Sequence, residues 1–256
     1  ITKLMDECKA MGIQTLGPDV NESNLKFTVN HDGNIRFGLG AVKGVGEAAV
    51  QSIMEERKKN GPFLGIFDFV QRVNLNACNK KNMECLALAG GFDSFPELKR
   101  EQYFAANSKG ELFLETLMRY GNRYQADKAA AVNSLFGGEN VIDVATPEIP
   151  QGVERWSDLD RLNRERDLVG IYLSAHPLDE FSIVLEHVCN TRMSELEDKA
   201  ALAGREITMG GIVTSVRRGV SKNGNPYGIA KIEDYSGSTE IPFWGNDWVT
   251  YQGYLN

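Results

Sequence analysis

The chain has 256 residues, of which 42% are hydrophobic and 25% charged, a composition typical of ordinary globular domains. Its four cysteines are scattered without a CxxC pair and it has three histidines, which argues against a disulfide framework, a zinc ribbon and an imidazole metal site. Most of the net charge of -7 lies in residues 139–200, which hold 14 acidic and six basic side chains, so a mildly basic surface elsewhere is not excluded.

No apolar run long enough to span a membrane occurs, and the N-terminus lacks the features of a signal peptide. We therefore expect no membrane partner and a location in the reducing cytoplasm. The chain begins at Ile1 rather than at a methionine and stops within a strand-rich pattern. We expect it to be a piece of a longer protein.

Helical spacing of apolar residues predicts a first helix that ends at Gly12. The alternating pattern of residues 25–37 predicts a short β-hairpin. A glycine-rich stretch, Gly38–Gly46, follows and leads into a predicted helix that stops at Asn60–Pro62.

A second unit of helix, tight turn and helix is predicted around Lys80, Lys81, Gly90 and Gly91. Residues 139–152 lack periodicity and are predicted to form a linker. Further helices are predicted at residues 100–117, 125–138 and 156–173, followed by one that starts at 176–179.

Beyond Arg205 the pattern changes from helical to alternating, which predicts strands. An Asn-Gly pair within Lys222–Asn225 is a typical hairpin signal. Strands are predicted at residues 207–216, 227–232 and 238–244. Such a meander is the opening of a small barrel of the OB-fold type. We therefore predict an α+β, multi-domain fold in which a mainly α-helical module is followed by a partial β-barrel.

The glycine spacing of Gly38–Gly46 decides what kind of phosphate loop it can form. The first three glycines are one residue too far apart for a dinucleotide-binding G-x-G-x-x-G loop, and a Walker A ending is missing. A hairpin between two helices fits better, with Gly44 and Gly46 allowing positive φ and bringing backbone amides to a phosphate. Lys43 adds a charge beside them. The alternative is a structural turn that joins two packed helices.

The pair Asp158 and Asp160 has the Asp-x-Asp pattern of two-metal polymerases and nucleases, whose carboxylates must converge on two ions. Because both lie in a predicted helix, they point to different sides, and a solvated helix face is the simpler interpretation. No Ser-His-Asp or Cys-His pattern stands out. We therefore predict no catalytic residue in this chain.

The predicted strands combine cations with aromatic side chains. Arg217, Arg218 and Lys222 lie near the first hairpin, and Tyr227 follows them. Single-stranded nucleic acid is bound by such a combination of basic and aromatic groups. The pair Phe243–Trp244 fits either a stacking platform or the core of the barrel.

Four ordered stretches carry a resemblance to a known family: Pro18–Ser23, Phe37–Glu47, Leu88–Asp93 and Gly170–Leu178. Together they resemble the C-terminal half of the bacterial replicative DNA polymerase III alpha subunits, the C family of polymerases, over essentially the whole chain. The resemblance implies five parts: the end of the fingers region (1–36), a tandem helix-hairpin-helix DNA-binding domain (37–110), a helix and linker with a clamp-binding peptide (111–152), a helical connector (153–204) and the N-terminal part of an OB-fold (205–256).

The resemblance also implies partners. Duplex DNA would be held by its backbone at the hairpins, and the single-stranded template at the OB-fold. The DNA-contacting residues are then Lys43, Gly44, Val45, Gly46, Lys80, Lys81, Gly90, Gly91, Arg217, Arg218, Lys222 and Tyr227. The sliding clamp would bind the peptide Val132, Asn133, Ser134, Leu135 and Phe136, where the family has Gln-x-x-Leu/Met-Phe and this chain has valine in the glutamine position. The alternative for this peptide is a hydrophobic helix end packed on its own domain.

The family's palm carboxylates lie upstream of the matching region and have no counterpart here. The resemblance therefore implies a parent DNA-directed DNA polymerase that uses Mg²⁺, whereas this chain is expected to hold no cofactor and to be inactive alone. Other replisome subunits are expected as further partners. Two alternatives stay open on the sequence: a helix-hairpin-helix and OB scaffold of a DNA-repair protein, and a protein-interaction module.

Overall fold

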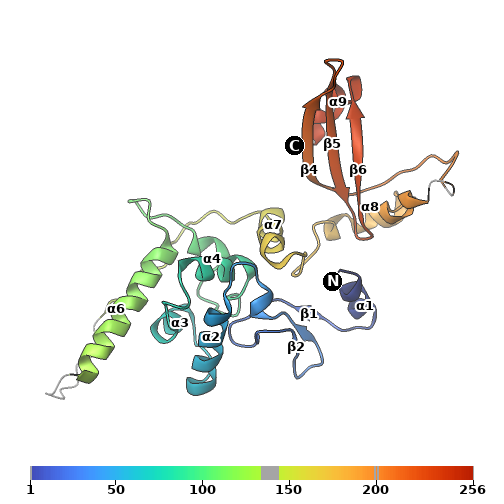
Figure 1. Ribbon diagram of the computed structural model, residues 1–256. Coiled ribbons are helices and arrows are strands. Elements are labelled where there is room, and N and C mark those ends of the chain that lie inside the picture. Colours follow the sequence, from blue (N-terminus) through green and yellow to red (C-terminus); the bar gives the residue numbers. More distant parts are fainter. Residues whose placement is uncertain (1, 134–143, 199, 201, 256) are drawn as a thin grey trace. The chain divides into compact units, whose positions relative to one another are not determined.

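The computed structural model describes residues 2–133, 144–198, 200 and 202–255. The chain divides into two compact units, Ile1–Ala175 and His176–Asn256. Helices dominate the first unit, and the second contains a three-stranded sheet (Figure 1). The α+β class predicted from the sequence is thus confirmed.

The first unit opens with α1 (Thr2–Ala10) and a small sheet of β1 (Thr15–Leu16), β2 (Thr28–Val29) and β3 (Ile35–Arg36). The order is β1-β3-β2, with β1 parallel and β2 antiparallel to β3. The predicted hairpin is the β2–β3 pair. Strand β1 was not predicted, because two residues are too few to show a period.

The helical module packs around one apolar core. Its elements are η1 (Leu39–Ala41), α2 (Glu47–Asn60), α3 (Ile66–Arg72), α4 (Lys80–Ala89), α5 (Arg100–Tyr103), α6 (Phe113–Asn133) and α7 (Asp158–Val169). Helix α3 packs against α6, and α4 against α7. Buried aromatic rings join the helices at the centre, where Phe69 and Phe92 lie 5.1 Å apart, centroid to centroid. The core therefore fixes the positions of the turns between the helices.

Three predicted helix boundaries were wrong. The region predicted as a helix at 100–117 forms only the single turn α5 before α6 begins, and α6 runs unbroken to Asn133. Helix α7 ends at Val169 because Gly170 adopts a left-handed conformation with φ +85°, and residues 170–173 do not continue it. Helical periodicity marks a helix interior better than its ends.

The second unit contains η2 (Asp179–Phe181), α8 (Ser182–His187), η3 (Met193–Glu197), β4 (Ile212–Val220), β5 (Pro226–Glu233), β6 (Ser238–Trp244), α9 (Asn246–Tyr251) and η4 (Gln252–Tyr254). The three strands form an antiparallel meander, as predicted, and in the described part of the chain this sheet is not closed into a barrel. Strand β4 starts at Ile212, five residues later than predicted. One face of the sheet is covered by Trp248 of α9, which is only 5% exposed. Among the described helices, none combines the length and apolarity needed to cross a bilayer.

Candidate nucleic-acid interface

The glycine-rich loop makes its turn at Gly44. This residue has φ +86°, a conformation that glycine adopts without strain. Gly46 has an ordinary φ of -76° and is the residue that precedes α2, so the prediction of positive φ was confirmed at Gly44 and wrong at Gly46. The element before the turn is the three-residue 3₁₀ helix η1 rather than a full α-helix.

Most of the loop faces solvent. Lys43, Gly44 and Gly46 are exposed, whereas Val45 points into the core and is 8% exposed. The site therefore offers a lysine and bare backbone on its outer side. Val45 packs into the apolar core and offers almost no exposed surface to a ligand.

Three backbone amides at this turn have no hydrogen-bond acceptor among the described residues: those of Gly44, Glu47 and Ala48. The last two belong to the first turn of the 14-residue helix α2, where the helix dipole and the free N–H groups favour an anion. The amide of Gly46 donates to Asn82 Oδ1 at 2.9 Å. The expected phosphate contact from the Gly46 amide is therefore wrong in this structure, and Glu47 and Ala48 supply the free amides instead.

Contacts from α4 and α7 hold the loop in place. The amide of Lys43 donates to the carbonyl of Leu168 at 2.9 Å, and a methyl group on Gly44 would lie 2.6 Å from Sγ of Cys85. Burial raises the pKa of Cys85, which keeps that sulfur a neutral packing group. The side chain of Lys81 lies beside the same point, with its Cε 3.8 Å from where that methyl group would be.

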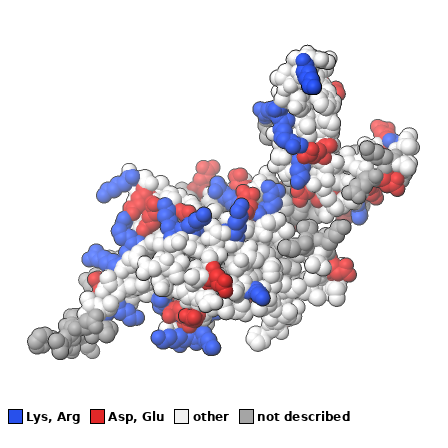
Figure 2. Space-filling model, viewed as in Figure 1, with Lys and Arg blue, Asp and Glu red and all other residues white. Residues whose placement is uncertain are grey.

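The three lysines near the loop, Lys43, Lys80 and Lys81, differ in whether a carboxylate already pairs with them. Lys80 Nζ lies 2.6 Å from Glu115 Oε1 and 3.7 Å from Glu84 Oε1. Lys43 and Lys81 have no ion pair within the described part of the chain. Over the helical unit, Figure 2 shows basic and acidic side chains interspersed, so a phosphate would respond to the local field at the loop rather than to a broad basic face.

The second glycine turn is buried. Gly90 and Gly91 are inaccessible, and their amides donate to carbonyls of the last turn of α4, those of Ala87 and Leu86. This is a C-terminal cap of the helix, with Gly90 in the left-handed conformation at φ +86°. The expected contact of these two glycines with DNA is therefore wrong in this structure.

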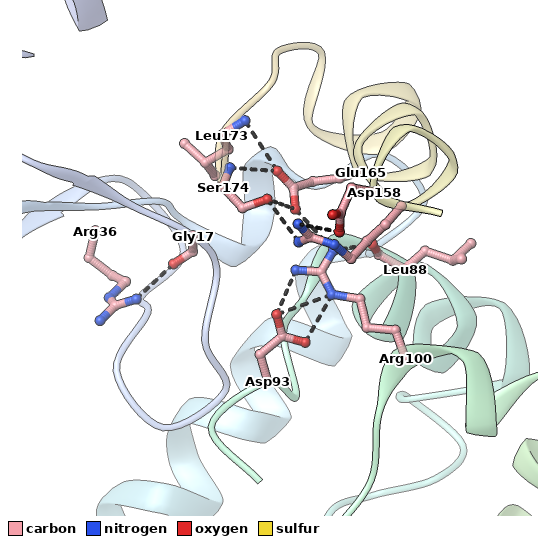
Figure 3. Close-up of polar contacts among 10 residues, drawn as sticks. Gly17, Arg36, Leu88, Asp93, Arg100, Asp158, Glu165, Leu173 and Ser174 are labelled. Carbon is pink, nitrogen blue, oxygen red and sulfur yellow. Dashed lines mark hydrogen bonds and ion pairs between the residues drawn. The ribbon is translucent and has the colours of Figure 1, made fainter. Parts of the chain in front are cut away.

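What occupies the space beside the second turn is a buried ion network centred on Arg100, drawn in Figure 3. Arg100 Nη1 donates to Glu165 Oε2 at 2.9 Å and to the Leu88 carbonyl at 3.1 Å, and Nη2 pairs with Asp93 Oδ2 at 2.5 Å. Glu165 is 1% exposed and also accepts from the backbone amides of residues 173 and 174, at 3.1 and 2.8 Å. Burial alone would lower the pKa of Arg100, but the two carboxylates outweigh it and raise the pKa.

The Asp158 and Asp160 pair does not form a metal site. Ser157 caps α7 by accepting from the Asp160 amide, and both aspartates sit in the first turn, where negative charge complements the helix dipole. Arg161 lies 3.7 Å from Asp158. Throughout the described ranges, no three His, Cys, Asp or Glu side chains lie close enough to hold a metal ion. These side chains do not fit the Mg²⁺ ions of a polymerase.

In the second unit, the predicted nucleic-acid residues lie on opposite faces of the sheet. Gly219 pairs in register with Tyr227, which pairs with Trp244, and the two rings are 5.0 Å apart. Arg217 lies two residues from Gly219 on β4, hence on the same face, where its Nη2 is 2.6 Å from Glu240 Oε2.

Arg218 lies on the other face, with its guanidinium 5.8 Å from the ring of Trp248. Lys222 is exposed in the β4–β5 turn. The open face therefore carries the aromatic pair and Arg217. Sequence reasoning left Trp244 undecided, and its 56% exposure now places it with the stacking candidates.

The predicted clamp peptide lies at the edge of what the structure describes. Val132 and Asn133 belong to the end of α6, and Ser134, Leu135 and Phe136 lie outside the described residues. The clamp contact stays a prediction.

Comparison with known proteins supports the interpretation of the glycine-rich loop as part of a helix-hairpin-helix motif. A family model described as a helix-hairpin-helix motif matches residues 12–103, which include both glycine turns. DNA polymerase III subunit alpha of Pasteurella multocida is 34% identical over 245 residues, and that of Mycobacterium tuberculosis is 34% identical over 253, each match covering 96% of this chain. The Vibrio cholerae protein is 32% identical over 260 residues and matches 100% of the chain.

The chain belongs to the DNA polymerase III alpha subunit family. It spans about a fifth of the length of these relatives. This membership confirms the resemblance seen in the sequence motifs, and the exposed turn at Gly44 lies within the matched helix-hairpin-helix region.

Proposed function

We propose that the chain is a duplex-DNA-binding part of a DNA-directed DNA polymerase and carries no active site of its own. One observation carries this proposal: the amides of Gly44, Glu47 and Ala48 have no acceptor among the described residues and lie at an exposed turn beside Lys43 and Lys81. Amides and lysines of this kind bind phosphate without reading the base sequence. The polymerase's Mg²⁺ chemistry is assigned to other parts of the parent protein, working in the cytoplasm with the other replisome subunits.

The open face of the sheet supports a second contact, with single-stranded template. Tyr227 and Trp244 form an aromatic pair on that face, and Arg217 lies on the same face in an exposed ion pair with Glu240. The Tyr227 ring can lie over Gly219 because glycine leaves room for it; a Cβ atom at residue 219 would lie 2.7 Å from the ring. Bases stack on such fixed aromatic surfaces with little sequence preference.

We also propose that residues 132–136 bind the sliding clamp. The support is their position after the helical module and the Leu135–Phe136 pair, which would fill an apolar pocket. Replacing both residues by alanine is expected to abolish association in a pull-down with the clamp, with unchanged duplex binding as the control. Full retention of clamp binding would contradict the assignment.

The duplex contact is tested by measuring the dissociation constant across a salt titration. Lys43→Gln is expected to weaken binding and to reduce the slope of log K against log salt by about one unit, the loss of one phosphate contact. Lys58→Gln is the matched control, since this exposed lysine lies eleven residues along α2, about 16 Å from the turn. Equal slopes for the wild type and both variants would overturn the proposal.

A further inference from the structure

Asn82 is a buried polar side chain that links the two halves of the helical module. It lies in α4 and is 6% exposed. Its Oδ1 accepts from the amide of Gly46 at 2.9 Å, across 36 residues of sequence. Its Nδ2 donates to Asn79 Oδ1 at 2.8 Å. Both ends of the carboxamide are therefore engaged.

The orientation of this carboxamide is fixed by its partners. Asn79 caps α4, and its Oδ1 also accepts from the backbone amide of Asn82 at 3.2 Å. The Gly46 amide can only donate, so the oxygen of Asn82 must face it, and the NH₂ group must face the Asn79 oxygen. A rotation of the carboxamide by half a turn would break both hydrogen bonds.

This bond satisfies an amide that α2 cannot satisfy itself. Gly46 is the N-cap of α2, and the third residue of the helix, Ala49, has no side-chain oxygen that could accept from the Gly46 amide. Asn82 takes up the Gly46 amide from a different helix and holds the backbone there. The neighbouring amides of Gly44 and Glu47 remain without an acceptor among the described residues, on either side of the tethered one.

We propose that Asn82 is a positioning residue for the DNA contact. It touches no phosphate itself; its carboxamide holds Gly46 so that the free amides around the turn keep the spacing at which one anion can meet them together. This inference rests on the proposed duplex binding. Pre-organisation of this kind strengthens binding because the loop need not be ordered when DNA arrives.

The test compares Asn82→Ala with the wild-type chain in two measurements. Hydrogen exchange of the Gly46 amide is expected to become at least tenfold faster, because its acceptor is gone. The duplex dissociation constant is expected to rise about tenfold, equivalent to about 1.4 kcal/mol. The salt slope should match the wild type, because Lys43 and Lys81 still meet phosphate.

Two further variants separate positioning from general stability. Asn82→Asp keeps an acceptor for Gly46 and should restore slow exchange of that amide. Asn74→Ala is the matched control: it removes a side chain that accepts from the amides of Asn76 and Ala77, in the turn before α4. This control should lose stability in urea and keep wild-type affinity for duplex DNA, whereas a merely structural role for Asn82 predicts that affinity follows stability in both variants.

The outcomes distinguish the two proposals. A wild-type chain that does not bind duplex DNA overturns the proposed function and this inference with it. A wild-type chain that binds, with Asn82→Ala binding equally well despite fast Gly46 exchange, overturns the positioning role alone. If Asn82→Ala does not fold, Asn79→Ser replaces it, because serine can cap α4 but cannot reach the carboxamide of Asn82. We expect this variant to bind duplex DNA about threefold more weakly. An unchanged affinity would refute the inference.

Discussion

Removing Glu165 is expected to destabilise the helical unit strongly. Glu165 is 1% exposed, and its two oxygens accept from Arg100 Nη1, from the Ser174 hydroxyl and from the amides of Leu173 and Ser174. In Glu165→Ala the guanidinium of Arg100 stays buried, with 8% of its side chain exposed, and loses one of two counter-charges. The variant therefore leaves a buried charge only partly matched.

The magnitude follows from what remains around Arg100. Breaking a buried ion pair from one side costs about 3–5 kcal/mol. Asp93 still pairs with Arg100, and the Leu88 carbonyl still accepts from it, so we expect the lower end, about 3 kcal/mol. Glu165→Gln should lose about half as much, because its oxygen can still accept from the two backbone amides while its NH₂ group faces the arginine.

Urea unfolding followed by circular dichroism at 222 nm measures this loss, since most helical residues lie in the first unit. With a slope of about 2 kcal/mol per molar urea, the midpoint should fall by about 1.5 M in Glu165→Ala. The matched control is Glu111→Ala, which removes an exposed ion pair with Arg119 and should leave the midpoint unchanged. A midpoint for Glu165→Ala within error of that control would refute the reasoning.

Four further changes test other parts of the molecule. Glu47→Gln should strengthen duplex binding by roughly fivefold at low salt, measured by anisotropy, because it removes a like charge beside the phosphate. Gly44→Ala should destabilise the chain by about 1–3 kcal/mol in urea, because φ is +86° there and the new methyl group would meet Sγ of Cys85. Trp244→Ala should weaken single-strand binding by about 1–3 kcal/mol and leave duplex binding unchanged. Burial raises the pKa of the Cys78 thiol from 9.0 to about 12, so above pH 9 the thiol loses its proton more readily in the unfolded state than in the folded state. The free energy of unfolding should therefore be unchanged below pH 9 and fall by up to about 4 kcal/mol toward pH 12. In Cys78→Ala this fall should be smaller.

The part of the site that depends on local backbone geometry could be predicted from the sequence. A glycine-rich stretch before a helix marks a tight turn, and Gly44 has the expected positive φ, whereas Gly46, directly before α2, does not. The lysine beside it and the meander of β4, β5 and β6 carry similarly local signals. Each of these depends on residues only a few positions apart.

The rest depends on contacts between distant residues. The second pair of glycines, Gly90–Gly91, forms a buried cap, because Arg100 and its carboxylates fill the space beside it. The pairing of Lys80 with Glu115 spans 35 residues, and that of Gly46 with Asn82 spans 36. The sequence holds one signal for the hydrogen bond between Gly46 and Asn82. Asn82 is a polar residue three positions after the helix cap Asn79 and precedes a mostly apolar run, a pattern that indicates a buried hydrogen bond.

The charge at the turn limits how tightly this chain alone can hold DNA. Lys43 and Lys81 bring two positive charges and Glu47 one negative charge, so about two phosphate contacts are the most the loop supports. Two contacts give a salt slope of about -1.8, and a rise from 50 to 200 mM salt then weakens binding by roughly tenfold. Such a contact sets the position of the duplex more than it sets affinity. Because the loop is tethered by Asn82 and Leu168, its backbone is already ordered before an anion binds, so binding loses little further conformational entropy.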